Sequence, residues 1–353
     1  MSQFHKKYGK WINVDPASNV DARYVKLRVL CIPQAGMGAW AYHGWQSKLP
    51  NTVELLPVEL PGRNARIQEP KLESMAECVS GLLEGVSGLL AEKPFVVLGH
   101  SLGALMAFEL CVALEKGGLG PLCLIVSGSR PPQFAAPRHD QDLETPAMAK
   151  LSSPRFWDAF ERRYGANPDL QSSGIRNFIE PLLRADFGLL ETYAPSRTPA
   201  DGPLKWPLVA CCATGDNRVA PEQMRAWGDF ADKGPGGFEQ HWFDPKPKML
   251  PWSTPHRYLV EGPDQFINFL AEKCAQLIAE PAADFANGAY VVSAKRGALL
   301  REGIGMDSPQ VDILHSGANV TVVEVASPTD PKTRVRIDAP VSGWLSAHML
   351  RKP

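Results

Sequence analysis

Five consecutive residues in the first third of the chain have the spacing of a serine nucleophile held on a tight turn. Gly99-His100-Ser101-Leu102-Gly103 fits the pattern G-x-S-x-G, in which small residues two positions from the serine permit a sharp strand-to-helix turn. An apolar run (95–98) precedes the motif and a helix-like run (102–114) follows it. The pattern predicts that Ser101 is a nucleophile placed at a helix N-terminus, where unpaired N–H groups favour developing negative charge. The alternative is a purely structural turn.

A serine hydroxyl is a poor nucleophile by itself and needs a base that is oriented by an acid. In folds that carry this turn, the three residues follow one another as serine, acid and histidine. Asp216 lies just past an apolar strand-like run (208–212), so we expect it to be the acid. The alternative for Asp216 is a turn residue that caps the helix-like segment 221–230.

Two histidines compete for the role of the base. His256 precedes the last helix-like segment (266–278), where the base is expected, whereas His241 lies inside a probable strand. His100 adjoins the nucleophile and is badly placed to accept its proton. The spacing therefore predicts His256 as the base.

Hydrolysis through a serine also needs two backbone N–H groups that bind the oxyanion. One is the N–H of Leu102, the residue after the nucleophile. The second is expected from the glycine-containing loop 33–38 after the first strand, and we assign it to the N–H of Ala35. The alternative for this loop is an ordinary tight turn.

Alternating apolar runs and helix-like segments indicate the fold that positions these residues. Short β-rich runs alternate with segments of helical periodicity up to about residue 280, which predicts an α/β fold with a mostly parallel sheet and right-handed crossovers. The expected strands are 25–32, 53–56, 95–98, 122–127, 208–212 and 238–243, and the expected helices outside the insertion are 72–91, 102–114 and 266–278.

Two segments depart from this alternation. Residues from about 130 to 195 contain helical periodicity at 156–164 and 175–190, and we interpret them as a lid inserted over the site, with a structural excursion as the alternative. After Glu280, strand-like runs at 289–293, 314–325 and 334–339 predict a small all-β domain over 285–353. Pro281-Ala282-Ala283 marks the boundary, so the first domain is expected to be 1–280.

Composition excludes several other functions. The 353 residues carry 37 basic and 38 acidic side chains, a net charge of −1, which argues against a nucleic-acid or membrane-surface protein. No apolar run approaches the ~20 residues that span a bilayer, and the polar N-terminus lacks a secretory signal, so we expect a cytoplasmic protein. The seven cysteines contain no CxxC and are expected to be free buried thiols. Cys211 and Cys212 point to opposite faces of a strand, and neither a metal nor another cofactor is expected.

Four short segments, in this order, resemble the type II (editing) thioesterases of polyketide, nonribosomal peptide and fatty-acid synthesis. They are Ile32-Pro33-Gln34-Ala35-Gly36, Glu59-Leu60-Pro61-Gly62-Arg63, the turn around Ser101, and Leu183-Arg184-Ala185-Asp186-Phe187 followed by Glu191-Thr192-Tyr193. The resemblance implies an α/β-hydrolase fold with a helical lid and a triad of Ser101, Asp216 and His256. It also implies an acyl or peptidyl carrier protein bearing acyl-phosphopantetheine as the partner. Arg63 and Asp186 match motif positions near the site.

The sequence departs from this family in two places. The family has Gly-Gly-His-Phe-Phe around the base, where this chain has Thr254-Pro255-His256-Arg257-Tyr258, preceded by a longer proline-rich segment (244–254). The family also lacks the C-terminal segment, which resembles a bacterial SH3-like module in residues 298–303, 317–320 and Gly343-Trp344-Leu345-Ser346. Such modules bind peptides or polymers, and a passive docking or stabilising tail is the alternative.

The expected activity is hydrolysis of acyl thioesters through an acyl-Ser101 intermediate. A carboxylesterase or an acyltransferase with the same triad would be indistinguishable in sequence. A non-catalytic scaffold that recruits partners through the C-terminal module is a third hypothesis, against which the complete serine, acid and histidine order argues.

Overall fold

The computed structural model describes residues 8–14, 20–234, 237–245, 249–278, 288–294, 298–303, 308–325, 334–339, 341–346 and 350–351. The chain divides into two compact units, Met1–Cys274 and Ala275–Pro353. The boundary expected at Pro281-Ala282-Ala283 lies outside the described residues. Within the described part of the chain, every helix is too short or too polar to cross a lipid bilayer.

The first unit is built on a six-stranded sheet in the order β2-β1-β3-β4-β5-β6, and all neighbouring pairs are parallel. Five of the strands are buried along their whole length, because helices cover both faces. This confirms the α/β fold. The strands are β1 (Leu27–Ile32), β2 (Val53–Pro57), β3 (Phe95–His100), β4 (Cys123–Ser127), β5 (Leu208–Ala213) and β6 (Phe238–Phe243).

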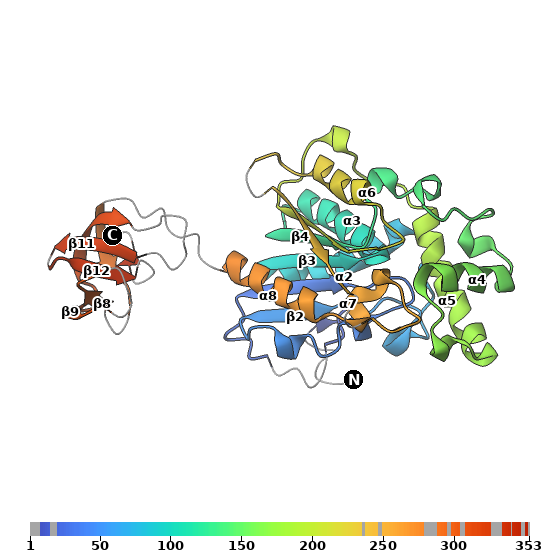
Figure 1. The fold of residues 1–353 in the computed structure, drawn as a ribbon, viewed down its shortest axis with the longest axis horizontal. Helices are drawn as coiled ribbons and strands as arrows, with labels where there is room; N and C mark the ends of the chain where they lie inside the picture. The colour runs from blue at the N-terminus through green and yellow to red at the C-terminus, as the bar shows by residue number, and fades with distance from the viewer. Residues whose placement is uncertain are drawn as a thin grey trace. The chain divides into compact units, whose positions relative to one another are not determined.

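Helices pack on both sides of this sheet (Figure 1). The helices are α2 (Met75–Ala91), α3 (Leu102–Lys116), α6 (Pro221–Arg225), α7 (Tyr258–Glu261) and α8 (Asp264–Ile278), besides two in the insertion. Helices α2 and α3 share one apolar core with alternate strand residues, among them Cys212. On the opposite face, Cys274 of α8 lies beside Cys31 and Cys123. Adjacent residues of one strand therefore pack on opposite faces of the sheet, as expected for Cys211 and Cys212.

Helix α2 begins three residues later than its apolar periodicity suggests. Ser74 is extended, and its side chain accepts a hydrogen bond from the backbone N–H of Glu77, so the helix starts at Met75. This is N-capping, in which a serine oxygen satisfies one of the unpaired N–H groups of the first turn.

A helical insertion joins β4 to β5 and contains α4 (Ser153–Tyr164) and α5 (Ser173–Glu191) (Figure 1). Its own apolar cluster is rich in aromatic side chains, with Phe156 and Phe160 of α4 packed against Phe187 of α5. Leu183 of α5 reaches Gly36, which follows β1. The insertion therefore lies at the carboxyl ends of the strands, where sites form in open α/β sheets.

The second unit is a seven-stranded sheet in the order β13-β7-β10-β11-β12-β8-β9, with every pair antiparallel. Its architecture fits an SH3-like module. The expected strand 314–325 is two strands instead, because Gly317, with φ +85°, forms a turn between them. The strands are β7 (Gly288–Val292), β8 (Ala298–Arg301), β9 (Gln310–Leu314), β10 (Asn319–Val325), β11 (Arg334–Ala339), β12 (Gly343–Ser346) and β13 (Leu350–Arg351).

Candidate active site

Ser101 lies on a strained turn between β3 and α3. Its φ of +54° and ψ of −118° fall outside the regions that non-glycine residues normally adopt. The glycines on either side permit this turn: a Cβ on Gly99 would lie 2.0 Å from the carbonyl O of Gly103, and a Cβ on Gly103 would lie 2.2 Å from the carbonyl O of Ile32. The motif therefore has the strand-turn-helix setting that it requires.

The structure brings Ser101, His256 and Asp216 into one hydrogen-bonded chain. His256 Nε2 lies 3.0 Å from Ser101 Oγ, and His256 Nδ1 lies 2.9 Å from Asp216 Oδ2. Because the ionised carboxylate only accepts, His256 carries its proton on Nδ1 and accepts the Ser101 hydroxyl proton at Nε2. This is the arrangement of a nucleophile, a base and an orienting acid.

Asp216 is kept ionised by its surroundings. It is 8% exposed and accepts a 2.8 Å hydrogen bond from the backbone N–H of Arg218. Burial by itself raises the pKa of this carboxyl, but the neighbouring His256 and the hydrogen bonds outweigh it, so the pKa lies below its ordinary value. An ionised Asp216 can stabilise the imidazolium that forms when His256 takes a proton.

The residues before His256 are anchored to the helical insertion. Ser253 forms an isolated antiparallel bridge with Gly165, just after α4. Thr254 Oγ1 donates to the carbonyl O of Arg163 at 3.3 Å, and the ring of Tyr164 lies 5.5 Å from that of His256. Residues 253 and 254, at the end of the proline-rich segment, therefore join His256 to the insertion.

His100 does not act on Ser101 but contacts the backbone of His256. Its Nε2 donates to the backbone carbonyl O of His256 at 3.0 Å, which leaves Nδ1 to accept from the Ser127 hydroxyl at 2.9 Å. Ser127 Oγ in turn accepts from the Tyr258 hydroxyl at 2.7 Å. Burial and the nearby His256 lower the pKa of His100 to about 3, which keeps the ring neutral as this network requires.

The loop after β1 forms a turn beside the nucleophile. Met37 N–H donates to the carbonyl O of Gln34 at 3.1 Å, and Gly36 has φ +76°, the value of the third residue of a type II turn. Ala35 is the second residue of this turn and lines the same cavity as Ser101. Leu102 is the first residue of α3, so its backbone N–H is one that the helix leaves unpaired.

A cavity of about 140 Å³ opens onto Ser101 and His256. The insertion supplies most of its apolar wall, and the turn after β1 supplies another part of the lining. This arrangement suits an apolar chain attached to a reacting carbonyl. The insertion's lining residues are Phe160, Tyr164, Asn167, Leu170, Ile179, Leu183 and Phe187.

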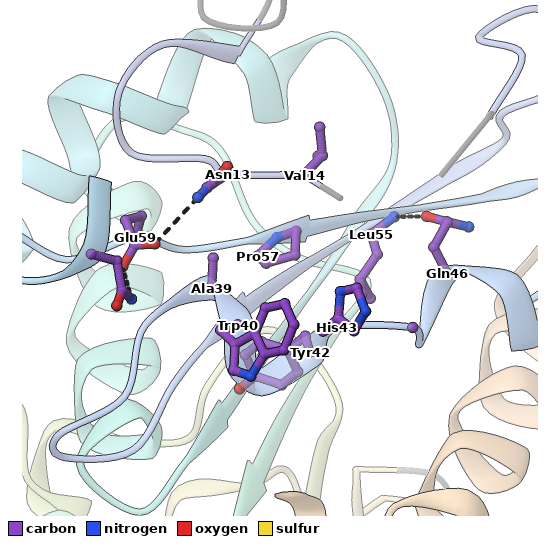
Figure 2. Close-up of a pocket in the computed structure, with 12 residues that line it drawn as sticks. Asn13, Val14, Ala39, Trp40, Tyr42, His43, Gln46, Leu55, Pro57 and Glu59 are labelled. Carbon is purple, nitrogen blue, oxygen red and sulfur yellow. Dashed lines mark hydrogen bonds between the residues drawn. The ribbon is translucent and has the colours of Figure 1, made fainter. Parts of the chain in front are cut away.

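A second cavity, of about 360 Å³, is lined by residues 13–14, by residues between 39 and 46, and by Leu55 and Pro57 of β2 (Figure 2). Trp40, which is 67% exposed, stacks on His43 at 4.2 Å between ring centroids. Figure 2 also shows the Asn13 amide directed at the Glu59 carboxylate, a contact of 3.3 Å. None of the residues expected at the site lines this cavity. Among the described residues, no cluster of three or more His, Cys, Asp or Glu could hold a metal ion.

The structure brings the predicted triad together and places the other candidate base elsewhere. Ser101, Asp216 and His256 converge, and His241 lies on β6 against Phe269, with ring centroids 4.3 Å apart. The sequence analysis missed the support that His100 gives to the base. The signal was its position inside the turn motif, but its partner is 156 residues away.

The chain also matches known proteins. The model of the family described as "Thioesterase domain" matches residues 27–274. The gramicidin S biosynthesis protein GrsT of Aneurinibacillus migulanus is 32% identical over 64% of this chain and 82% of its own length. The thioesterase PikA5 of Streptomyces venezuelae is 31% identical over 62% of this chain and 73% of its own length.

Solved structures agree with these relatives. RedJ, a thioesterase from the prodiginine biosynthetic pathway in Streptomyces coelicolor, superposes with a TM-score of 0.62 at 27% identity, covering 77% of this chain and 100% of RedJ. YbtT, a type II thioesterase from the yersiniabactin NRPS/PKS biosynthetic pathway, superposes with a TM-score of 0.59 at 25% identity, covering 74% of this chain and 97% of YbtT. The chain therefore belongs to the thioesterase family of α/β-hydrolases and is a hydrolase that acts on thioester bonds.

Proposed function

We propose that this enzyme hydrolyses acyl groups from the phosphopantetheine arm of an acyl or peptidyl carrier protein, as an editing or releasing activity beside a synthase. The observation that carries the proposal is the hydrogen-bonded chain of Ser101, His256 and Asp216 at the mouth of an apolar cavity. The named pathways of the relatives, gramicidin S and yersiniabactin biosynthesis, support this context. The carrier protein and the cytoplasmic location are parts of the proposal.

The proposed reaction has two halves. Ser101 Oγ attacks the thioester carbonyl carbon while its proton passes to His256 Nε2, and the N–H groups of Ala35 and Leu102 receive the negative charge on the carbonyl oxygen. The carbon–sulfur bond then breaks, and His256 returns the proton to the departing pantetheine sulfur. In the second half, water loses a proton to His256 as it attacks the acyl-serine, and Ser101 regains a proton when the free acid leaves.

The test compares acyl-pantetheine thioesters with oxygen esters of the same acyl chains, using the wild type and Ser101→Ala. The proposal expects faster turnover of the thioesters, at least about a thousandfold loss in Ser101→Ala, and free acid as the product. Preferential turnover of the oxygen esters would assign a carboxylesterase. Transfer of the acyl group to an added alcohol or amine in place of water would assign an acyltransferase. The absence of turnover, with Ser101 unlabelled by a fluorophosphonate, would assign the scaffold role.

A further inference from the structure

Asp186 of α5 and Arg63 of the loop after β2 form a buried ion pair beside the turn that follows β1. The guanidinium donates twice to the carboxylate, with both contacts at 2.8 Å, and the side chains are 4% and 2% exposed. A bidentate pair of this kind has a defined geometry as well as charge. The pair therefore joins two segments that are 123 residues apart.

Each member of the pair also binds the turn itself. Asp186 Oδ2 accepts from the backbone N–H of Gly36 at 2.7 Å, and Arg63 Nη1 donates to the carbonyl O of Met37 at 2.9 Å. The Gly36 N–H and the Met37 carbonyl are thus both bound by side chains of the same ion pair, Asp186 and Arg63 respectively. Ala35, the residue expected to donate to the oxyanion, immediately precedes Gly36.

The Gly36 N–H belongs to the central peptide of the turn, and its direction distinguishes a type II turn from a type I turn. With the N–H directed at Asp186, Gly36 has a positive φ and its α-carbon faces Leu183, where an added Cβ would lie 2.6 Å from Cδ2. Loss of the carboxylate removes the hydrogen bond that fixes this central peptide, and the peptide that carries the Ala35 N–H is the one immediately before it in the turn.

The other side of the loop is fixed independently of the insertion. An added Cβ on Gly38 would lie 2.0 Å from Glu59 Oε1, and this carboxylate is held by the amides of Asn64 at 3.0 Å and Asn13 at 3.3 Å (Figure 2). Residue 38 is therefore set by the body of the fold, whereas the peptide at 35–36 depends on Asp186 of the insertion.

We infer that Asp186 and Arg63 are positioning residues that set the direction of the Ala35 N–H, so that the oxyanion site is formed only when α5 is in place over the cavity. The inference rests on the proposed function of the site. It gives the helical insertion a role in the reaction itself, besides lining the acyl cavity.

The experiment uses Asp186→Asn in the full chain and three measurements with one acyl chain. These are kcat/KM for the thioester, the inhibition constant of the matching trifluoromethyl ketone, and the dissociation constant of the matching thioether, which has no carbonyl. Removing one oxyanion donor costs about 10²- to 10³-fold in other hydrolases, so a misdirected donor should cost about 10- to 100-fold. We expect that loss in kcat/KM, an equal weakening of the ketone, and less than about threefold change for the thioether.

Glu54→Gln is the matched control, because it removes the carboxylate of another buried pair, Arg28–Glu54, with both side chains 3% exposed. This variant should unfold at a lower temperature and keep the wild-type kinetic constants. Arg63→Lys is the second variant if Asp186→Asn does not fold, since it retains the charge but loses the bidentate contact. It should weaken the ketone without weakening the thioether.

Unchanged ketone binding in both variants would overturn the inference and leave a purely structural ion pair. Equal weakening of the thioether and the ketone would also overturn it, in favour of a role in shaping the acyl cavity. The same three measurements can be made with an oxygen ester if the wild type prefers one. In that case the proposed substrate fails while the role of Asp186 is still tested.

Discussion

The imidazole of His100 donates a 3.0 Å hydrogen bond from Nε2 to the backbone carbonyl O of His256. The residue next to Ser101 therefore positions His256 through the main chain, and in the neutral ring its Nδ1 accepts from Ser127. The pairing of β3 with β4 places His100 opposite Ser127, so the parallel sheet itself sets the contact between these two side chains.

The depressed pKa of His100 makes a prediction about stability and pH. The folded pKa is about 3 against an ordinary value of 6.5, so between these values the unfolded chain binds a proton that the folded chain does not. This group's contribution to stability is present above about pH 6.5 and is lost as the pH falls toward 3, by at most roughly 1.4 kcal/mol per pH unit. Urea unfolding of the wild type and His100→Gln at pH 7 and pH 4.5 measures it. The variant should lose less stability on acidification, and parallel losses would contradict the assignment.

The strained backbone of Ser101 predicts a conflict between stability and activity. A residue held at φ +54° and ψ −118° costs about 1–3 kcal/mol, and glycine adopts positive φ without that cost. Ser101→Gly should therefore be more stable than Ser101→Ala by roughly 1 kcal/mol, although both lose the nucleophile and its hydrogen bond to His256. The measurement is the denaturant midpoint of each of these two variants, compared under the same conditions. An alanine variant as stable as the glycine variant would show that the turn is unstrained.

Two Gly-to-Ala changes, one at the turn around Ser101 and one in α2, should have opposite effects on stability. Gly99→Ala places its Cβ 2.0 Å from a backbone oxygen that cannot move away, so a loss of about 3 kcal/mol or more is expected. Gly88 lies in α2 with no atom within 4 Å of an added Cβ, so Gly88→Ala should gain about 0.5–1 kcal/mol from helix propensity. Thermal unfolding of both variants is the measurement. Equal effects at the two positions would mean that the turn can relax.

The residues of this site that could be predicted from the sequence are those whose position depends on their neighbours in the chain. The turn around Ser101 needs glycines at fixed offsets, and Asp216 is the third residue after a buried strand. Their partners could not be derived in the same way. Arg63 and Asp186 were recognisable only as motif positions, because the contact between them depends on how α5 packs over the turn after β1.

Element boundaries show the same division between local and tertiary signals. Most strands of the parallel sheet are largely apolar runs, and the positions of all six were predicted to within a few residues. The anchoring of residues 253–254 to the end of α4 had no signal in the sequence, since it depends on a main-chain bridge between Gly165 and Ser253. A bridge of this kind uses backbone groups that every residue type except proline possesses.

In the proposed reaction, Ser101 carries the acyl group between the two halves. The most direct measurement is the mass of the peptide containing Ser101 after the enzyme is mixed with an acyl-pantetheine thioester and quenched in acid within one turnover. This role of Ser101 predicts that the mass of the acyl group appears on this peptide in the wild type, disappears as free acid is released, and is absent in Ser101→Ala. Release of acid by the wild type with no acyl group on Ser101, or with the acyl group on another residue, would contradict it.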